Sequence, residues 1–326
     1  MRRRSLSLAL AAVAAQVTGL AWSPAVAQDA WPSRTIRIIT PSPAGVGADA
    51  FARLYADHLG KALRVTVIVE NKPGAAGTLG TDAAAKSAPD GYTLLLTTSL
   101  PMTVAPHLFP KLPYKPASDF VPVAQLYRGG SFLIATPSFA GNSLKDLVSL
   151  AKQKPDSIPY ASYGAGGTAH LGMEQLQDAA DIKLVHIPYK QSAMTDVSSG
   201  QVSIGFEPPV SALPNIRSGR VKALAYTGDK RSPTLPDVPT LAESYPGLEV
   251  FTWVGVWAPR GTPEPIVRRL HDTINAATKV PELQKAIADT GSEPMITSAA
   301  QMQATVDRET DRLGKLIKAK NITLNN

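Results

Sequence analysis

Apolar positions switch repeatedly along the chain between short continuous runs, typical of buried strands, and runs at helical spacing. In residues 48–61, for example, Phe51, Leu54, Tyr55 and Leu59 recur every three or four residues and would form one face of a helix. The first third of the chain predicts alternating strands and helices at residues 36–40, 48–61, 65–69, 77–88 and 93–97. This βαβαβ order predicts an α/β fold with a mainly parallel sheet and right-handed crossovers.

A second alternating series follows, and after it a tail that is mainly helical. The series predicts strands and helices at residues 132–135, 143–154, 160–162, 168–179 and 184–187, and short strands at 202–206 and 221–226. Pro and Asp residues punctuate 232–246, which predicts an irregular surface stretch. One more strand is expected at 250–257, followed by helices at 265–277, 281–289 and 299–318.

The tail has no strand pattern beyond 250–257, so it is expected to pack on the first sheet rather than form a third domain. A chain of 326 residues is long enough for two domains of about 150 residues each. It would cross between two lobes near residues 126–130 and 250–255, which produces a hinge and a ligand cleft. We expect residues 28–127 and 252–326 to form lobe one, and residues 128–251 to form lobe two.

Residues 1–27 have the pattern of a signal peptide. Three arginines follow the initial Met, an apolar stretch runs to about residue 17, and Ala25-Val26-Ala27 supplies small residues for cleavage. A membrane anchor is the alternative, but a spanning helix needs about 20 apolar residues, and polar residues interrupt this stretch. We expect export to the periplasm, with cleavage near Ala27 and no later membrane span.

Composition excludes several kinds of site and partner. The chain has no cysteine, so disulfides, thiolate nucleophiles and iron–sulfur clusters are excluded. Its five histidines do not pair as H-x-x-x-H or H-E-x-x-H, so no metal site is expected. Cleavage would remove three arginines and no acid, which lowers the formal net charge from +7 to +4. The remaining basic residues are scattered, so no nucleic-acid partner is expected.

One glycine-rich turn matches a dinucleotide-binding fingerprint. Residues 45–50 fit G-x-G-x-x-A between a strand and a helix, and Glu70 lies at the end of the next strand. However, residues 41–44 separate the strand from the first glycine, and exported proteins seldom meet free nicotinamide cofactors. No cofactor is therefore expected. The turn and the helix N-terminus would suit a carboxylate as well as a phosphate.

Six motifs follow one another along nearly the whole mature chain. They are WPSRTIRIITPSPAG at 31–45, VENKPGAAG at 69–77, PDGYTL at 89–94, HIPYK at 186–190, RSPTLPDVPT at 231–240 and WVG at 253–255. Together they resemble the Bug family, the extracytoplasmic solute receptors of tripartite tricarboxylate transporters. A single motif would be weak, but the ordered series is specific.

The resemblance implies a type II periplasmic-binding-protein fold, in agreement with the two crossings expected above. It also implies capture of a small organic carboxylate between two closing lobes, without a reaction, and delivery to a membrane partner with a large and a small subunit. In this family the ligand carboxylate is typically held by loop N–H groups, hydroxyls and ordered water rather than by arginine. A monomer is expected for such a receptor.

Carried onto this sequence, the resemblance implies ligand contacts in both lobes. In lobe one they are the loop 42–47, with Ser42, Pro43, Ala44, Gly45 and Val46, and the strand-end hydroxyls of Thr98 and Ser99. In lobe two they are Gly164, Gly166, Gly167 and Thr168, together with Tyr189, Asp196 and Glu207. Hydroxyl and backbone donors suit an anion because they give charge-assisted hydrogen bonds without burying a second full charge.

The chain departs from the family pattern within this proposed pocket. The family often has Phe-Pro-Pro-Gly-Gly where residues 42–46 are Ser-Pro-Ala-Gly-Val. The sequence Gly-Gly-Thr-Ala-His at 166–170 shifts the expected hydroxyl by one position, and Gln191 replaces the usual Gly. The stretch from Gln191 to Asp196 is also about two residues short. The identity of the ligand is therefore the least transferable part of the resemblance.

Several of these residues also have ordinary structural interpretations. Asp49 suits the first turn of a helix, where the dipole favours an acid, and Thr168 suits a helix N-cap. His170 and Glu174, four residues apart, fit a helix-surface or lobe-packing pair better than acid–base chemistry, since no nucleophile accompanies them. Asp196 would repel an anionic ligand unless it accepts a hydrogen bond from a ligand N–H, an O–H or a water.

Three further residues near the expected cleft have structural alternatives. Glu207 follows a strand-like run and precedes two prolines, so a structural role at the lobe edge is equally compatible. Trp253 and Trp257 lie on the return strand, where core packing is favoured over ligand stacking.

The sequence thus favours a periplasmic solute-binding receptor over an enzyme. No G-x-S-x-G motif occurs, and Ser162-Tyr163-Gly164 lacks the glycine that precedes such a serine and has no base marked for it. An exported α/β enzyme acting on a small anion remains the alternative function. A protein that kept the fold but lost transport is a third possibility.

Overall fold

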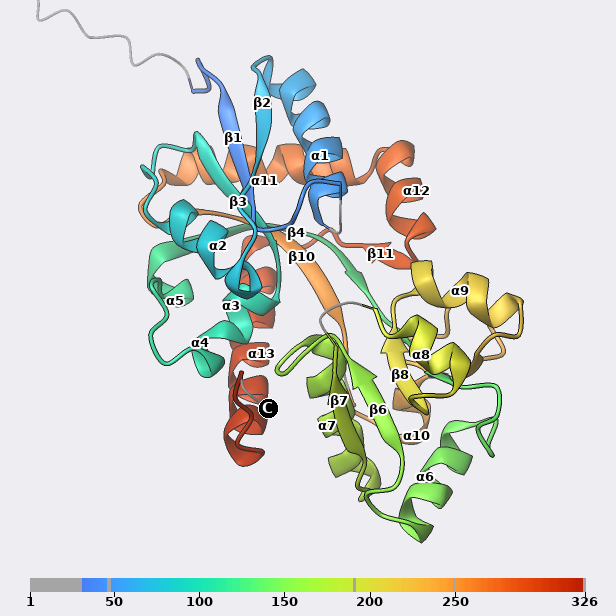
Figure 1. The fold of residues 1–326 in the computed structure, drawn as a ribbon. Helices are drawn as coiled ribbons and strands as arrows, with labels where there is room; N and C mark the ends of the chain where they lie inside the picture. Colours follow the sequence, from blue (N-terminus) through green and yellow to red (C-terminus); the bar gives the residue numbers. More distant parts are fainter. Residues whose placement is uncertain (1–30, 46–47, 190–191, 249, 325–326) are drawn as a thin grey trace, which may run out of the picture.

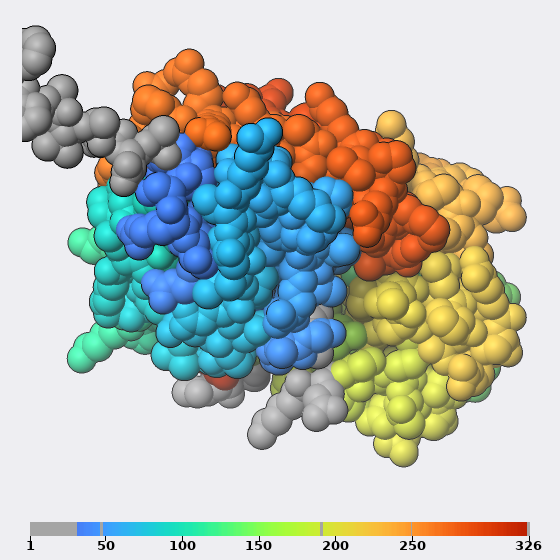
Figure 2. Space-filling view, turned by 90° about the horizontal axis from the view of Figure 1, so that it is seen from above, coloured from blue at the N-terminus to red at the C-terminus, as the bar shows by residue number. Residues whose placement is uncertain are grey.

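The computed structural model describes residues 31–45, 48–189, 192–248 and 250–324. The expected signal peptide therefore lies outside the described residues. The described chain forms two lobes, each a mixed β-sheet with helices on both faces (Figure 1). Seen from above, the blue segments near the start of the described chain and the orange and red segments near its end lie together in one body, and the yellow and green middle of the chain forms the other (Figure 2).

The larger sheet, in lobe one, has six strands in the order β11-β4-β10-β3-β1-β2. Its strands are β1 (Ile36–Thr40), β2 (Val67–Asn71), β3 (Thr93–Thr98), β4 (Phe120–Gly129), β10 (Thr252–Pro259) and β11 (Ser292–Pro294). β1 runs parallel to β2 and β3, as the alternating pattern predicts. β10 runs antiparallel to both β3 and β4, so the prediction of a mainly parallel sheet is wrong beyond the first three strands.

The helical tail also contributes a strand that was not predicted. β11 pairs antiparallel with β4 at the edge of the larger sheet. It has three residues and ends in a proline, which is too short for an alternating pattern to reveal. The helices around it are those expected in the tail: α11 (Glu264–Thr278), α12 (Pro281–Asp289) and α13 (Ala299–Ala319).

The smaller sheet, in lobe two, has five strands in the order β7-β6-β8-β5-β9. Its strands are β5 (Phe132–Ala135), β6 (Pro159–Ser162), β7 (Val185–Pro188), β8 (Ile204–Glu207) and β9 (Lys222–Tyr226). β6 is parallel to β7 and β8, whereas β5 is antiparallel to β8 and β9. Its helices are α6 (Leu144–Gln153), α7 (Thr168–Ala180), α8 (Met194–Ser199), α9 (Pro209–Arg217) and α10 (Leu241–Ser244).

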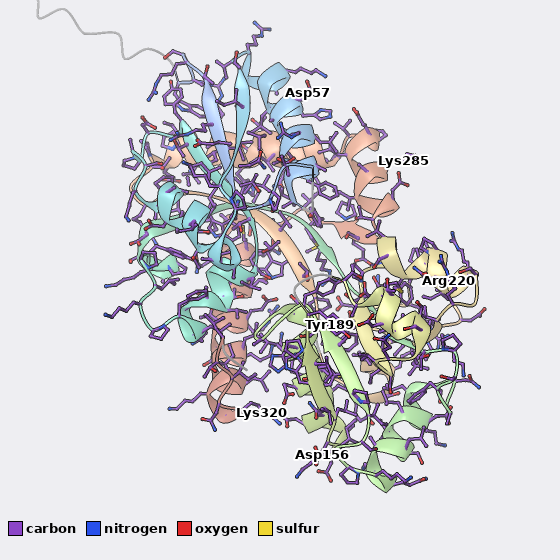
Figure 3. All side chains as sticks on the ribbon, viewed as in Figure 1. Asp57, Asp156, Tyr189, Arg220, Lys285 and Lys320 are labelled. Carbon is purple, nitrogen blue, oxygen red and sulfur yellow. The ribbon has the colours of Figure 1, made fainter. Side chains whose placement is uncertain are left out.

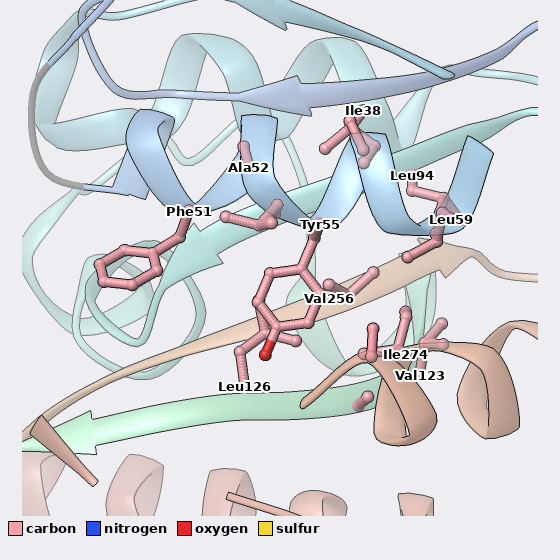
Figure 4. Packing of buried hydrophobic residues seen from close by; sticks show 14 of the residues in the cluster. Ile38, Phe51, Ala52, Tyr55, Leu59, Leu94, Val123, Leu126, Val256 and Ile274 are labelled. Carbon is pink, nitrogen blue, oxygen red and sulfur yellow. The ribbon is translucent and has the colours of Figure 1, made fainter. Parts of the chain in front are cut away.

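One face of the larger sheet packs on α1 (Ala48–Leu63), α11 and α12. The apolar stripe of α1 supplies Phe51, Tyr55 and Leu59 to this core (Figure 4). The Tyr55 hydroxyl lies 2.8 Å from Thr278 Oγ1 on α11. Because the Thr278 hydroxyl donates to the carbonyl of Ile274, Tyr55 is the donor in this buried pair.

The opposite face is covered by α13, by α2 (Thr78–Ala85) and by the short helices α3 (Leu100–Thr103) and α4 (Ala105–Leu108). The 3-10 turn η1 (Ala75–Gly77) directly precedes α2. A further short helix, α5 (Pro116–Asp119), leads into β4. α13 extends beyond lobe one and contacts α7 of lobe two. Leu171 of α7 is buried there against Leu313 and Ile317 of α13.

The chain passes from one sheet to the other directly after β4 and again just before β10. The first passage is closely packed, because a Cβ on Gly130 would lie 2.7 Å from the backbone nitrogen of Gly228. Beside it, Arg128 pairs with Asp229 of lobe two and lies 3.6 Å from Glu293 of lobe one. Within the described ranges, the structure contains no helix with the length and apolar character needed to cross a bilayer.

The Tyr55–Thr278 contact gives a first prediction. Changing Tyr55 to Phe removes the donor, and we expect the free energy of unfolding to fall by about 1 kcal/mol. Urea unfolding measures the change. The matched control is Thr273→Val on the exposed side of α11, where the hydroxyl donates only to the Arg269 carbonyl; it should change stability by less than about 0.5 kcal/mol. Equal stability of Tyr55→Phe and the wild type would contradict the role of this contact.

Candidate functional site

The loop that follows β1 is held by one buried carboxylate, Asp49. Its Oδ2 accepts hydrogen bonds from the Gly45 N–H at 2.7 Å and from Arg53 Nε at 2.9 Å. Its Oδ1 accepts from Asn71 Nδ2 at 2.7 Å, and the same Asn71 group donates to the Ser42 carbonyl at 2.9 Å. Burial raises the pKa of Asp49, but hydrogen bonds from Arg53, Gly45 and Asn71 outweigh it and leave the pKa below its ordinary value.

This network favours the structural interpretation of Asp49. It also engages the N–H of Gly45, which the sequence analysis counted among the backbone donors for an anion. Pro43 and Ala44, between Ser42 and Gly45, are exposed. Val46 lies outside the described residues, so its predicted contact has no structural counterpart here.

The strand-end residue Ser99 lies at the boundary between the lobes. Its N–H donates to the Trp253 carbonyl of β10 at 2.9 Å, and its side chain is buried. Ser99 and Thr168, which were predicted from opposite lobes, line the same small interlobe pocket with Gln175 and Arg312. The pocket volume of about 20 Å³ has room for about one water molecule. Thr98, the preceding residue, is half-buried and does not line this pocket.

The glycine loop before α7 is folded against the other lobe. Gly164 and Gly166 both have positive φ angles, at 103° and 73°, which favour glycine. A Cβ on Gly166 would overlap the side chain of Leu108 on α4. This contact places the predicted loop directly on lobe one.

Thr168 begins α7 but is not its N-cap. Gly167 occupies the N-cap position, so the prediction of a capping hydroxyl at Thr168 is wrong. The Thr168 hydroxyl instead accepts a hydrogen bond from Thr252 Oγ1 of β10 at 3.3 Å. It therefore lies where lobe two meets the chain crossing.

Two stacked histidines, the buried His170 and the half-buried His186, lie next to the glycine loop. His170 Nδ1 accepts from the Gly166 N–H at 3.0 Å, so its proton is on Nε2, which lies 3.9 Å from Glu174 Oε1. The His170 ring stacks on His186 with centroids 3.8 Å apart. Burial lowers the pKa of both histidines to about 4. The pair His170–Glu174 thus packs inside lobe two and is not a helix-surface pair.

The structure also reveals a serine–histidine contact that the sequence did not indicate. Ser162 Oγ lies 2.6 Å from His186 Nε2, across the neighbouring strands β6 and β7. Ser162 Oγ also accepts from the Gly164 N–H at 3.2 Å, and the side chain is buried. A substrate carbonyl would have no access to this hydroxyl, so the contact serves the loop structure.

The remaining predicted residues of lobe two form two hydroxyl–carboxylate clusters. Tyr189, which lies at the end of the smaller sheet that faces lobe one (Figure 3), donates to Asp196 Oδ2 at 2.7 Å. The hydrogen bond to Asp196, together with burial, raises the pKa of Tyr189 to about 12. Asp196 thus accepts from a hydroxyl of its own lobe, and its contact with a ligand stays a prediction.

Glu207 is buried and accepts three hydroxyl donors. They are Tyr163 at 2.6 Å, Ser192 at 3.2 Å and Ser211 at 2.7 Å. Tyr163 and Ser192 were not predicted from the sequence, since no local pattern indicates which residues donate hydrogen bonds to a carboxylate far away in the chain. Tyr163 is 43% exposed, so its ring remains accessible although its hydroxyl is engaged.

Comparison with known proteins agrees with this architecture. The family described as "Tripartite tricarboxylate transporter family receptor" matches residues 51–322. The chain belongs to this family. The receptor is similar to solved periplasmic proteins over nearly their whole length, and the two-lobed type II periplasmic-binding-protein fold follows.

Three of these structures illustrate the likeness. The periplasmic binding protein BugD is 36% identical, with a TM-score of 0.73 over 90% of this receptor and 99% of BugD. R. palustris Rpa4515 with adipate is 32% identical, with a TM-score of 0.77 over 90% and 100% of the two chains. MatC from Rhodopseudomonas palustris, with bound malate, is 32% identical, with a TM-score of 0.73 over 88% and 99%.

The contact between Gly166 and Leu108 gives a second prediction. Changing Gly166 to Ala would place a Cβ at a positive φ and against Leu108, so we expect about 2 kcal/mol lower stability. The double variant with Leu108→Ala should lose less than the sum of the two single changes, because the collision is relieved. Urea unfolding of the four proteins measures this coupling. Strict additivity would show that the loop and α4 are not in contact.

The histidine pair gives a third prediction, on pH. The pKa of each histidine is about 4 when folded and 6.5 ordinarily, so between these values the unfolded chain binds more protons. The contribution of the two neutral histidines to the free energy of unfolding is complete above pH 6.5. It is lost as the pH falls towards 4, by about 3 kcal/mol for each histidine. Urea unfolding from pH 7 to pH 4 measures the loss. It should be smaller in His170→Asn, and equal pH slopes for the two proteins would refute the assignment.

Proposed function

We propose that this receptor is a periplasmic protein that binds a small carboxylate between its lobes and delivers it to the large and small membrane subunits of a transporter. Residues 28–127 and 252–326 would form lobe one, and residues 128–251 lobe two. Cleavage near Ala27 would release the mature protein, which would act as a monomer and without turnover. The observation that carries the proposal is that Ser99 and Thr168, from opposite lobes, line one pocket. This pocket has room for about one water molecule, so the lobes would have to move apart to admit a carboxylate ligand.

The pocket is lined by the hydroxyl residues Ser99 and Thr168 and by two charged residues, Glu309 and Arg312. Hydroxyls and helix-end N–H groups can bind a carboxylate without the desolvation of a second buried charge. The acid that lines this pocket, Glu309, is buried and accepts from Trp253 Nε1 at 2.8 Å. Asp49 and Glu207, outside the pocket lining, accept several donors each. Two similar proteins were solved with adipate and with malate, which supports an aliphatic dicarboxylate as the first ligand to test.

The second candidate function is an exported enzyme of the same fold. The contact between Ser162 and His186 is the observation in its favour. Burial of the Ser162 side chain and its engagement with the Gly164 backbone count against it. Recovery of an unchanged ligand after incubation separates the two functions.

The fourth prediction tests binding by thermal unfolding of residues 28–326 with adipate, malate and citrate, with NAD and glucose as controls. A ligand at 100 times its Kd should add about 2.7 kcal/mol, a rise in Tm of several degrees. Thr168→Val should weaken binding about tenfold, since it removes a hydrogen bond to a charged group. The control Thr273→Val, on an exposed part of α11, should leave affinity unchanged.

Two outcomes would contradict the proposal. If no carboxylate raises the Tm while NAD does, the glycine-rich turn after β1 is a nucleotide site. If a carboxylate is chemically converted during incubation, the receptor is an enzyme.

A further inference from the structure

Tyr163 carries an exposed aromatic ring at the edge of lobe two that faces lobe one. It directly follows β6, and the parallel strands β6, β7 and β8 end at the same edge of the smaller sheet. Tyr189, which directly follows β7, lies at this edge on the side of lobe one (Figure 3). The loop that begins at Tyr163 reaches lobe one three residues later, where Gly166 packs against Leu108. In open α/β sheets, ligands bind outside the carboxyl ends of the strands, which is where this ring lies.

The orientation of the ring is fixed through its hydroxyl. The Tyr163 hydroxyl donates to Glu207 Oε2 at 2.6 Å, and Glu207 is itself held by the hydroxyls of Ser192 and Ser211. Burial of the hydroxyl and the neighbouring Glu207 carboxylate raise the pKa of Tyr163, so the hydroxyl stays protonated and remains a donor. The residue is nevertheless 43% exposed. The polar end of the side chain is therefore turned into lobe two, and the ring is the accessible part.

The space beside the ring is open, and the polar groups around it are engaged. Among the described residues, a Cβ on Gly164 would meet only the Tyr189 carbonyl oxygen, at 3.8 Å. The Tyr189 hydroxyl donates to Asp196, and Glu207 accepts from its own lobe. A ligand hydroxyl beside the ring would have to displace one of these hydrogen bonds or lose its water without replacement, and both lower the affinity. A hydrocarbon surface meets no such cost, because its burial is favourable.

The small interlobe pocket leaves most of a ligand to neighbouring surfaces. Ser99 and Thr168 line a space for about one water molecule, and Tyr163 is not part of that lining. Once the lobes have moved apart, a carboxylate group at these two hydroxyls would leave the remainder of the ligand outside the pocket. Tyr163 begins the loop that leads to Thr168, so its ring is the apolar surface of lobe two next to that position.

We propose that the Tyr163 ring determines the specificity of the receptor, by selecting a carboxylate with an unsubstituted hydrocarbon body over a hydroxylated acid. The methylene chain of a linear dicarboxylate is such a body. One carboxylate would lie at Ser99 and Thr168, and the chain would lie on the ring. This inference rests on the carboxylate binding proposed above and names the ligand class within it.

The fifth prediction compares adipate with galactarate, by calorimetry on residues 28–326. Galactarate has the same six-carbon chain and two carboxylates, with four added hydroxyls. Adipate should bind at least about tenfold more tightly, since the added hydroxyls would lose water beside an apolar ring. Tyr163→Ala should weaken adipate binding at least about fivefold and bring the two affinities closer together. Tyr163→Phe, which keeps the ring, should keep the preference for adipate.

A matched control and the ratio of the two affinities separate ligand contact from a structural role. Ile68→Ala, at an exposed apolar residue of the edge strand β2, should change both affinities less than about twofold. If Tyr163→Ala only loosens the loop, both ligands weaken by the same factor, and the unchanged ratio overturns the proposal.

Other outcomes distinguish this inference from the receptor function. Equal binding of adipate and galactarate to the wild type, or binding of hydroxylated acids such as malate and citrate alone, overturns the specificity proposal while the receptor function stands. If no carboxylate binds at all, the receptor function fails, and the specificity proposal fails with it.

Discussion

The strand β10 is hydrogen-bonded along both edges, to β3 and to β4, and much of the candidate site depends on this pairing. The carbonyl of Trp253 accepts the N–H of Ser99, so β10 sets the position where β3 turns into α3. One residue earlier, Thr252 donates to Thr168 of the other lobe. The Trp253 ring also donates to Glu309 Oε2 at 2.8 Å, which secures α13. A single strand thus positions donors from both lobes and the helix that lies beside them.

Two buried acids, Asp49 and Glu207, accept their hydrogen bonds from the protein itself. Asp49 is satisfied by a backbone N–H, an amide and a guanidinium, and Glu207 by three hydroxyls. Several hydrogen bonds to each carboxylate offset the cost of removing its charge from water. The cost is that hydroxyls such as those of Tyr163 and Tyr189 are no longer available as ligand donors.

The sequence was a good guide wherever the evidence was local. The helical spacing in α1 and the continuous apolar run in β1 identify both elements, because each buries one face or a whole strand. β4 was missed as a strand, since Pro122 and the polar Gln125 and Arg128 interrupt its apolar run. The direction of β10 was also missed, because an apolar run has the same pattern in parallel and antiparallel sheets.

The candidate site was less predictable because its contacts join distant segments. The family resemblance selected Ser99 and Thr168, which the fold brings to one pocket. Nothing in the local sequence indicates that Ser162 meets His186, 24 residues away on the next strand.

The helix α13 borders the interlobe pocket, and its two ends are held by different parts of the protein. Its first turn has a capping box at Ser298, and Trp253 secures its middle to lobe one. Its last turn contacts lobe two, where Lys320 pairs with Asp178 and lies 3.6 Å from Glu174. A change in the angle between the lobes must therefore be absorbed at the C-terminal half of α13, since the first half is fixed on the larger sheet.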